Sequence, residues 1–339
     1  MFVSIAKKKD ISILDEILSY LYCLKDIVSS TYNYRKTYRN YLSISMHVSR
    51  RKYPIKAILK NRSSIEAKVI LHNRTGVISL LGLQNHKGLT YDMNTDAWTI
   101  PLQYQNGSRN DMQMVKLHGG RDNGEIIPIF VEDIYAFLQV KGKTVIDIGA
   151  NIGDSCIYFA LRGAEKIIGI EPLPKNFEIA KKNIEINNLS HKITLFLAGC
   201  AARLGSIVVD ATYQEIGACI VPDGSDHDNF KQRVKVPLLT LQHILEQNRI
   251  VTGDIVLKID CEGCEYDLIL AANDEVLQLF SYIMIEYHYG YRSLKQKLEN
   301  CGFKLSITKP HAHKRDYLYE FPEDKWMYTG HIYAQRNTK

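Results

Sequence analysis

The sequence contains no uncharged apolar run of about eighteen residues, the length that a membrane-spanning helix needs. Its N-terminus also lacks the pattern of a secretory signal peptide. The seven cysteines are odd in number and scattered, so they do not predict a disulfide framework. These absences argue against a membrane-spanning or disulfide-stabilised protein, and they predict a reducing, cytoplasmic compartment.

Acidic residues are missing from the stretch between Ile27 and Ile65, which carries nine lysine or arginine residues and five tyrosines. The net charge of the whole chain is +6, so the rest of the chain is slightly acidic and the basicity is local. The stretch could contact nucleic-acid phosphates, anionic lipid headgroups or a lipid-linked substrate, or it could be a solvated helical face. Among the partners we favour peripheral association with an anionic membrane through 27–65, with nucleic acid as the weaker alternative.

The most informative stretch is VIDIGANIGD, from Val145 to Asp154. Its first four residues predict a buried parallel strand, its two glycines a tight turn, and Asp154 with the following serine the start of a helix. A strand, a glycine turn and a helix in this order present backbone N–H groups to a ligand. A second apolar strand then ends on Glu171, whose carboxylate can accept from two ribose hydroxyls. Together the two stretches predict a nucleoside site.

The glycine spacing disfavours a dinucleotide as the ligand. A dinucleotide fold uses G-x-G-x-x-G so that the backbone can approach a pyrophosphate, but here the positions are Gly149, Asn151 and Asp154. An acid at the third position repels phosphate. The D-x-G-x-N-x-G form resembles motif I of class I methyltransferases, which bind S-adenosylmethionine.

Helices and strands alternate after Phe130, which predicts an α/β fold with a seven-stranded, mostly parallel sheet and helices on both faces. The expected strands are 143–148, 166–171, 193–198, 254–260, 282–287 and a closing pair, 303–308 with 331–334, and an inserted region adds 206–210, 218–221 and 234–236. The expected helices are 131–138, 154–162, 174–187, 241–247, one from Tyr266 and 293–301. We therefore assign 130–339 to one catalytic domain.

Residues 1–129 predict a helical arm followed by a small antiparallel β element. An apolar stripe at helical spacing indicates a helix over 10–29, and 30–62 continue as a second helical stretch that is broken near Pro54. The short strands are expected at 68–72, 77–83 and 97–104. No chemistry can be assigned to this part.

A group of acids follows the fourth strand, in the sequence KIDCEGCE from Lys258 to Glu265. In doubly wound sheets ligands bind beyond the carboxyl ends of the strands, where the strand order reverses, so Asp260 should face the Gly149 loop. Acids buried together suit a general base or a divalent-cation site, whereas the structural alternative is a set of acids that favours a helix start. Cys261 and Cys264 have a redox or zinc spacing, but no second pair with metal-ligand spacing accompanies them, and we interpret them as small apolar packing residues.

Four stretches together resemble FkbM-type methyltransferases: VIDIGANIGD at 145–154, IGIEP at 168–172, KIDCEGCE at 258–265 and IMIEYH at 283–288. The resemblance covers about 130–336, and its D-x-E-G-x-E pattern is the specific part. It implies a class I, Rossmann-like fold and S-adenosylmethionine-dependent O-methylation of a hydroxyl. The implied acceptor is a sugar in a glycan, a lipid-linked saccharide or a secondary metabolite.

The candidate residues follow from the motifs and from this resemblance. The candidates for the base are Asp260, Glu262 and His288. The residues assigned to the cofactor are Asp147, Gly149, Asn151, Gly153, Asp154, Ser155, Glu171, Pro172 and Asp260. No residue is assigned to a metal, although a divalent cation stays open for the acids. The alternatives are an RNA 2′-O-methyltransferase and a non-catalytic module that senses the cofactor.

Overall fold

The computed structural model describes residues 10–60, 68–86, 88–92, 94–106, 109–121, 125–212, 221–222, 230–250, 254–314 and 326–336. The chain divides into two compact units. One consists of Ala136–Lys339 together with the residues up to Tyr20, and the other is Leu21–Tyr135. The sequence-based division between 129 and 130 differs from this one mainly at the N-terminus, where it places the whole first helix in the N-terminal part.

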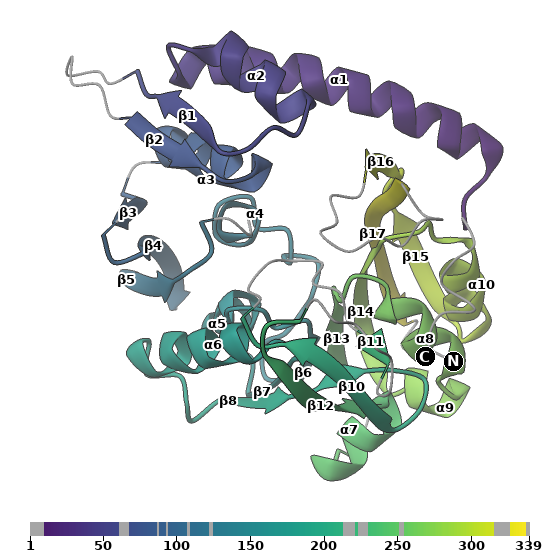
Figure 1. Cartoon of the computed structure of the whole chain (residues 1–339). Coiled ribbons are helices and arrows are strands. Elements are labelled where there is room, and N and C mark those ends of the chain that lie inside the picture. Colours follow the sequence, from purple (N-terminus) through teal and green to yellow (C-terminus); the bar gives the residue numbers. More distant parts are fainter. Residues whose placement is uncertain are drawn as a thin grey trace. The chain divides into compact units, whose positions relative to one another are not determined.

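The first unit is built on a sheet with the strand order β15-β17-β14-β13-β6-β7-β8 (Figure 1). Its strands are β6 (Thr144–Ile148), β7 (Lys166–Glu171), β8 (Ile193–Leu197), β13 (Ile255–Ile259), β14 (Phe280–Tyr287), β15 (Phe303–Ile307) and β17 (Trp326–Arg336), and β16 (His311–Lys314) pairs with β17. The strands from β8 to β14 pair in parallel, and β17 is antiparallel to both of its neighbours. The predicted α/β class with a mostly parallel sheet is confirmed.

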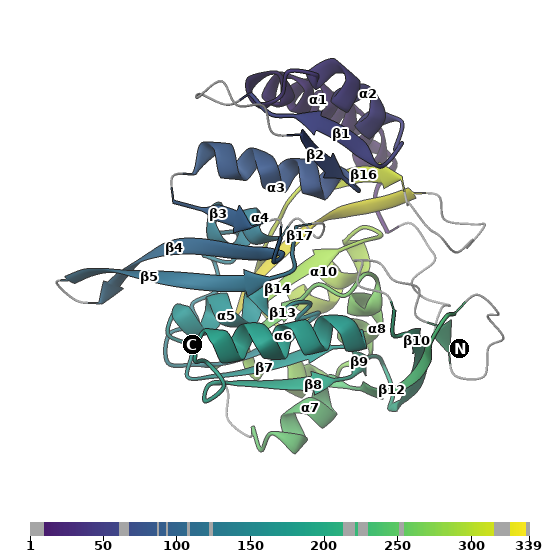
Figure 2. The same ribbon diagram turned by 60° about the vertical axis from the view of Figure 1, so that its left-hand side comes forward.

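Helices cover both faces of this sheet because alternate residues of a strand point to opposite sides. Ile146 and Ile148 of β6 belong to a buried cluster with α7 (Leu241–Gln247), α8 (Cys264–Ala271) and α10 (Arg292–Asn300). Between these two residues, Asp147 faces the other way and contacts Ser155 and Cys156 of a different helix. That helix is α5 (Asp154–Leu161), which contacts α6 (Pro174–Ile186). Figure 2 shows α6 along β7 and β8.

A smaller sheet is inserted between β8 and α7, as the broken strand–helix rhythm predicted. It has the order β11-β10-β12-β9 and a buried cluster of its own. Its strands are β9 (Gly199–Cys200), β10 (Gly205–Asp210), β11 (Val221–Pro222) and β12 (Arg233–Leu239). Most of the strand predicted at 218–221 lies outside the described residues. The short helix α9 (Asp274–Leu277) follows α8.

The N-terminal end of the described chain is part of the first unit. The Asp10 carboxylate accepts hydrogen bonds from the backbone N–H and the hydroxyl of Ser293, at 2.7 and 2.6 Å, and so satisfies the start of α10. The Asp10 backbone also pairs with that of Tyr289. Gly290 is required there, because a Cβ at this position would lie 2.5 Å from the Asp10 carbonyl carbon. The first residues of the arm therefore stabilise the fold.

The second unit combines helices with two small sheets. Its elements are most of α1 (Ile13–Thr37), α2 (Tyr41–Ser49), β1 (Ile55–Ile58), β2 (Lys68–Leu71), α3 (Arg74–Asn85), β3 (Thr90–Asp92), β4 (Ala97–Asn106), β5 (Arg109–His118) and α4 (Ile126–Phe130). β1 pairs with β2, and β3, β4 and β5 form a three-stranded antiparallel sheet. In the part of the chain that the structure describes, no helix is both long and apolar enough to cross a membrane.

Three local predictions for this region are wrong. The segment 77–83 is helical rather than extended, because Asn73 accepts a hydrogen bond from the Gly76 N–H and starts α3. The segment 131–138 is not a helix, since Asp133 has a φ of +58°, which a helix does not tolerate. The helical stretch expected over 30–62 ends at α2, and β1 follows.

Candidate active site

The loop after β6 lies directly against the end of β13. Gly149 has a φ of +79°, and a Cβ at this position would lie 1.7 Å from the Asp260 carbonyl oxygen. The Asp260 N–H in turn donates to the Ile148 carbonyl at 3.0 Å. Only glycine allows this approach, so the predicted meeting of Asp260 with the glycine loop is confirmed at the backbone. The same loop places Asn151 and Gly153 at φ values of +46° and +83°.

A buried ion pair between Lys258 and Asp147 stabilises this loop. The Lys258 ammonium lies 3.1 Å from Asp147 Oδ1 and donates to the Gly149 carbonyl at 2.8 Å. Asp147 also accepts from the Ser155 hydroxyl and from the Cys156 thiol. Burial opposes the charge of Lys258, but the carboxylates of Asp147, Asp260 and Asp154 together outweigh that effect and raise the pKa of the ammonium above its ordinary value. Asp147 and Ser155 thus hold the loop in place, and their predicted contact with the cofactor stays a prediction.

Two further acids line the same region. Glu171 accepts from the backbone N–H groups of Asn151 and Leu173, both at 2.9 Å, so it fixes the loop to the end of β7. Burial raises the pKa of Glu171 to about 7. Burial likewise raises the pKa of Asp154 to about 7, and Oδ2 of Asp154 has no hydrogen-bond partner. Pro172 is half-buried next to Glu171.

These residues fit the S-adenosylmethionine that the resemblance implies. The Glu171 carboxylate accepts one backbone hydrogen bond on each oxygen and a further one from the Asn176 side chain, so of its roughly four acceptor sites about one stays open for a ribose hydroxyl. Oδ1 of Asn151 is buried without a hydrogen-bond partner, which leaves an acceptor in the loop for a donor of the ligand. The Gly149 loop, Glu171 and Asp260 would hold the cofactor.

Asp260, Glu262 and His288 come together beside this loop. Nε2 of His288 lies 3.8 Å from Asp260 Oδ1 and 3.6 Å from Glu262 Oε2. The two acids are partly exposed, at 22% and 26% of their side chains, whereas His288 is buried. The three candidates for the base thus lie side by side, and their catalytic roles stay predictions.

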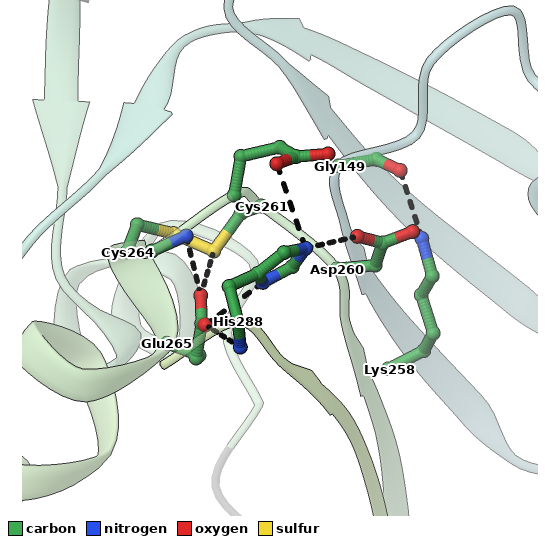
Figure 3. The surroundings of a disulfide bond; sticks show 9 residues. Gly149, Lys258, Asp260, Cys261, Cys264, Glu265 and His288 are labelled. Atoms are coloured by element: carbon green, nitrogen blue, oxygen red, sulfur yellow. Dashed lines mark hydrogen bonds and ion pairs between the residues drawn. A yellow bond between two sulfur atoms is a disulfide. The ribbon is translucent and has the colours of Figure 1, made fainter. Parts of the chain in front are cut away.

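Glu265 is fully buried and positions His288 (Figure 3). One of its oxygens accepts from both the backbone N–H and Nδ1 of His288, at 3.0 and 2.9 Å. The other oxygen accepts from the Gly263 N–H at 2.8 Å. This role of Glu265 could not be predicted from the sequence, because an acid in the first turn of a helix normally stabilises the helix N-terminus.

A disulfide joins Cys261 to Cys264, with Cα atoms 5.5 Å apart (Figure 3). Both cysteines pack against the buried cluster, as the sequence predicted, but the disulfide between them was not expected. Glu262 and Gly263 between them both have positive φ, at +57° and +119°, and this tight turn brings the sulfur atoms together. The bond closes the loop that carries Glu262.

The acids dominate the electrostatics of the site. Burial opposes a charge on His288, but Glu262 and Glu265 outweigh it and raise the pKa of the imidazole well above its ordinary value. Burial, together with the Asp260 carboxylate, raises the pKa of Glu286 to about 8. Glu286 lies in the IMIEYH stretch, but no role could be predicted for it. Its place beside the acids depends on the pairing of β14 with β13.

Comparisons with known proteins agree with this geometry. Residues 147–305 match the methyltransferase FkbM domain family. Methyltransferase 1 of Beauveria bassiana is 22% identical over 202 residues, which cover 54% of this chain and 81% of the relative. The ribosomal protein L11 methyltransferase of Photobacterium profundum is 43% identical over 59 residues, which cover 17% of this chain and 20% of that protein.

Solved structures show a partial likeness. The METTL16 MTase domain has a TM-score of 0.39 at 17% identity and covers 83% of this chain and 87% of its own. Precorrin-6y C5,15-methyltransferase from Geobacter metallireducens GS-15 has a TM-score of 0.33 at 16% identity, with coverages of 61% and 87%. The strand order described above identifies the fold independently of these structures. Residues 147–305 are thus similar to the methyltransferase FkbM domain, and the protein is an S-adenosylmethionine-dependent methyltransferase.

Proposed function

We propose that the protein methylates a hydroxyl of a sugar, in a glycan, a lipid-linked saccharide or a secondary metabolite. The observation that supports this proposal is the group of carboxylates around His288, next to the glycine loop. A hydroxyl must lose its proton when it is methylated, so a hydroxyl acceptor needs a neighbouring proton acceptor. Asp260 and Glu262 are partly exposed and can supply it.

The bound cofactor supplies a methyl group on a positively charged sulfur. The chain's own residues exclude water, orient the hydroxyl and take its proton. We assign the proton to Asp260, because its backbone contacts the Gly149 loop and its side chain is partly exposed. His288 is a positioning group in this scheme, since its imidazole lies between Glu265 and the two partly exposed acids.

An RNA 2′-O-methyltransferase is the second candidate, because its acceptor is also a hydroxyl. Methylation of adenine or cytosine amines is disfavoured, since those enzymes carry N-P-P-Y or N-P-P-F where this chain has Asp260-Cys261-Glu262-Gly263. The basic stretch at 27–65 is the feature that favours RNA.

The acceptor class can be tested with methyl-labelled S-adenosylmethionine and fractionated cell extract. We expect label in the saccharide or saccharide-lipid fraction. Glu171→Ala should weaken cofactor binding roughly 10- to 100-fold, through loss of about 1.5–3 kcal/mol, and should abolish labelling at low cofactor concentration. Glu178→Ala, on the exposed surface of α6, is the matched control. Label in RNA or on protein nitrogen would contradict the proposal.

We also propose that α1 docks on an anionic membrane, near a membrane-borne acceptor. Apolar residues along α1 are exposed over most of the first half of the helix. Its exposed residues, each between 56% and 79% accessible, are Ile13, Leu14, Ile17, Leu21, Leu24 and Val28. Such a stripe on a helix is typical of segments that lie in the membrane interface.

The charge beyond this stripe favours anionic lipid as its partner. α1 ends in Arg35 and Lys36, and the acid-free stretch continues through α2 and β1. Each basic residue near an anionic surface contributes about 1 kcal/mol. Of the five tyrosines in this stretch, Tyr34 and Tyr38 cannot reach a membrane, because they are buried in the core of the second unit, whereas Tyr32 is exposed. Arg62 lies outside the described residues.

Vesicle sedimentation tests the docking of α1. Leu21→Glu with Leu24→Glu should lower binding to phosphatidylserine-containing vesicles at least about 10-fold, because burial of each leucine contributes about 1.5–3 kcal/mol. Leu204→Glu, equally exposed but far along the chain in the catalytic unit, should bind as the wild type does. Salt should weaken the wild-type interaction. Unchanged binding in the double variant would refute docking, and salt-dependent RNA binding in its place would favour the second candidate function.

A further inference from the structure

We propose that Asp260, Glu262 and His288 bind one divalent metal cation. Each residue offers one ligand atom, and the three atoms all lie within 4.8 Å of one another. The inference relies on the proposed hydroxyl methylation for the role of the cation, but not for its binding.

The spacing of the donor atoms suits a shared ion better than direct hydrogen bonds. Nε2 of His288 is 3.6 and 3.8 Å from the nearest oxygens of Glu262 and Asp260, which exceeds the length of an N–H···O hydrogen bond. Ligands around an ion at about 2.0–2.4 Å are separated from one another by about 3.0–3.5 Å. A shift of a few tenths of an ångström would therefore bring all three donors to an ion.

The orientation of His288 is fixed in the way that metal-binding histidines require. Nδ1 donates to the buried Glu265 carboxylate at 2.9 Å, which directs Nε2 to the side of Asp260 (Figure 3). Nε2 also lies 3.6 Å from Glu262. The His288 side chain itself is buried, which restricts its rotation. Carboxylate–histidine–metal arrangements hold the imidazole in the same manner, and the outer carboxylate contributes to metal affinity.

Charge and rigidity point in the same direction. Besides the two carboxylate ligands, Glu265 contacts His288, and Glu286 is close enough to Asp260, Glu262 and His288 to interact with them. The nearby Lys258 is already paired with Asp147. The disulfide between Cys261 and Cys264 restricts the backbone of Glu262. The site therefore combines excess negative charge with ligands that are held before the ion binds.

The ligand set indicates the class of ion and what it does. Two carboxylates and one imidazole suit Mn²⁺ and similar ions of mixed oxygen and nitrogen preference. Three protein ligands leave about three of six positions for water or substrate. Two neighbouring hydroxyls of a sugar can take two of these positions. The ion would then lower the pKa of the attacking hydroxyl, and its proton would pass to the second oxygen of Asp260. The methyl–oxygen bond forms as the methyl–sulfur bond breaks.

Titration of the full chain with Mn²⁺, without acceptor, tests the site directly. Electron paramagnetic resonance should count one bound ion per chain. Glu265→Gln should weaken binding about 10- to 100-fold, as is typical for an outer carboxylate. Glu262→Gln removes a ligand whose side chain is partly exposed. This substitution should weaken Mn²⁺ binding at least about 10-fold. Glu178→Gln, on the surface of α6, serves as the matched control and should bind like the wild type.

Two results would overturn the inference: no binding above the level of a chain with the Asp260→Asn substitution, or equal affinity in the wild type and Glu262→Gln. Because no turnover is measured, either result leaves the proposed methylation intact. Conversely, stoichiometric Mn²⁺ binding together with label in RNA would keep the cation site and reject the saccharide acceptor.

Discussion

Replacing Lys258 with methionine is expected to lower the free energy of unfolding by about 3–5 kcal/mol at neutral pH. The substitution keeps the length of the side chain but removes the only cation that lies against Asp147 in the part of the chain that the structure describes. A buried carboxylate left without its partner costs this much, because its charge loses both water and the ion pair. The Gly149 carbonyl also loses its hydrogen bond from Lys258.

The loss should be reversed when the unpaired carboxylate is removed as well, because the cost comes from its buried charge. Urea denaturation at pH 7 measures the difference. The added Asp147→Asn substitution should restore most of the stability, and the exposed Lys304→Met should change little. A loss below about 1 kcal/mol at pH 7 would contradict this account of the ion pair.

Asp260→Asn is expected to lower turnover by a factor of roughly 10² or more while cofactor affinity changes much less. Asparagine keeps the shape of the side chain and its contact with the Gly149 loop, which is made by the backbone. It removes the charge that would accept a proton or bind a cation. Single-turnover kinetics with a saccharide acceptor, together with calorimetry of S-adenosylhomocysteine binding, separates the two effects.

Glu275→Gln, on the exposed helix α9, is the control for this measurement. Glu262→Gln shows whether the effect belongs to Asp260 alone or to the whole cluster. If Asp260→Asn and the wild type turn over at similar rates, Asp260 is neither the proton acceptor nor a ligand that the reaction needs.

The central sheet could be predicted from the sequence because its strands and glycine turns follow strong local rules. Val145–Asp154 shows its strand and turn directly, and the pairing of β6 with β13 then brings Asp260 to the glycine loop. The meeting of Asp260, Glu262 and His288 follows from that order. It required only that two neighbouring strands, β13 and β14, end at the same edge of the sheet.

The remaining features depend on contacts that no local pattern shows. The segment 77–83 has apolar and β-branched residues that suit a strand, and the cap at Asn73 decides otherwise. The stripe on α1 has helical spacing, but its spacing does not tell whether a core or solvent faces it. The roles of Glu265 and Lys258 arise from partners more than twenty residues away, His288 and Asp147.

Reduction of the Cys261–Cys264 disulfide should affect catalysis more than it affects the stability of the fold. A ring of four residues restricts the unfolded chain little, so opening it should cost about 2 kcal/mol or less. The same opening frees the backbone between Asp260 and Glu265, which carries Glu262. If Glu262 takes part in catalysis as proposed, a thiol reductant should change the enzymatic rate more than the melting temperature.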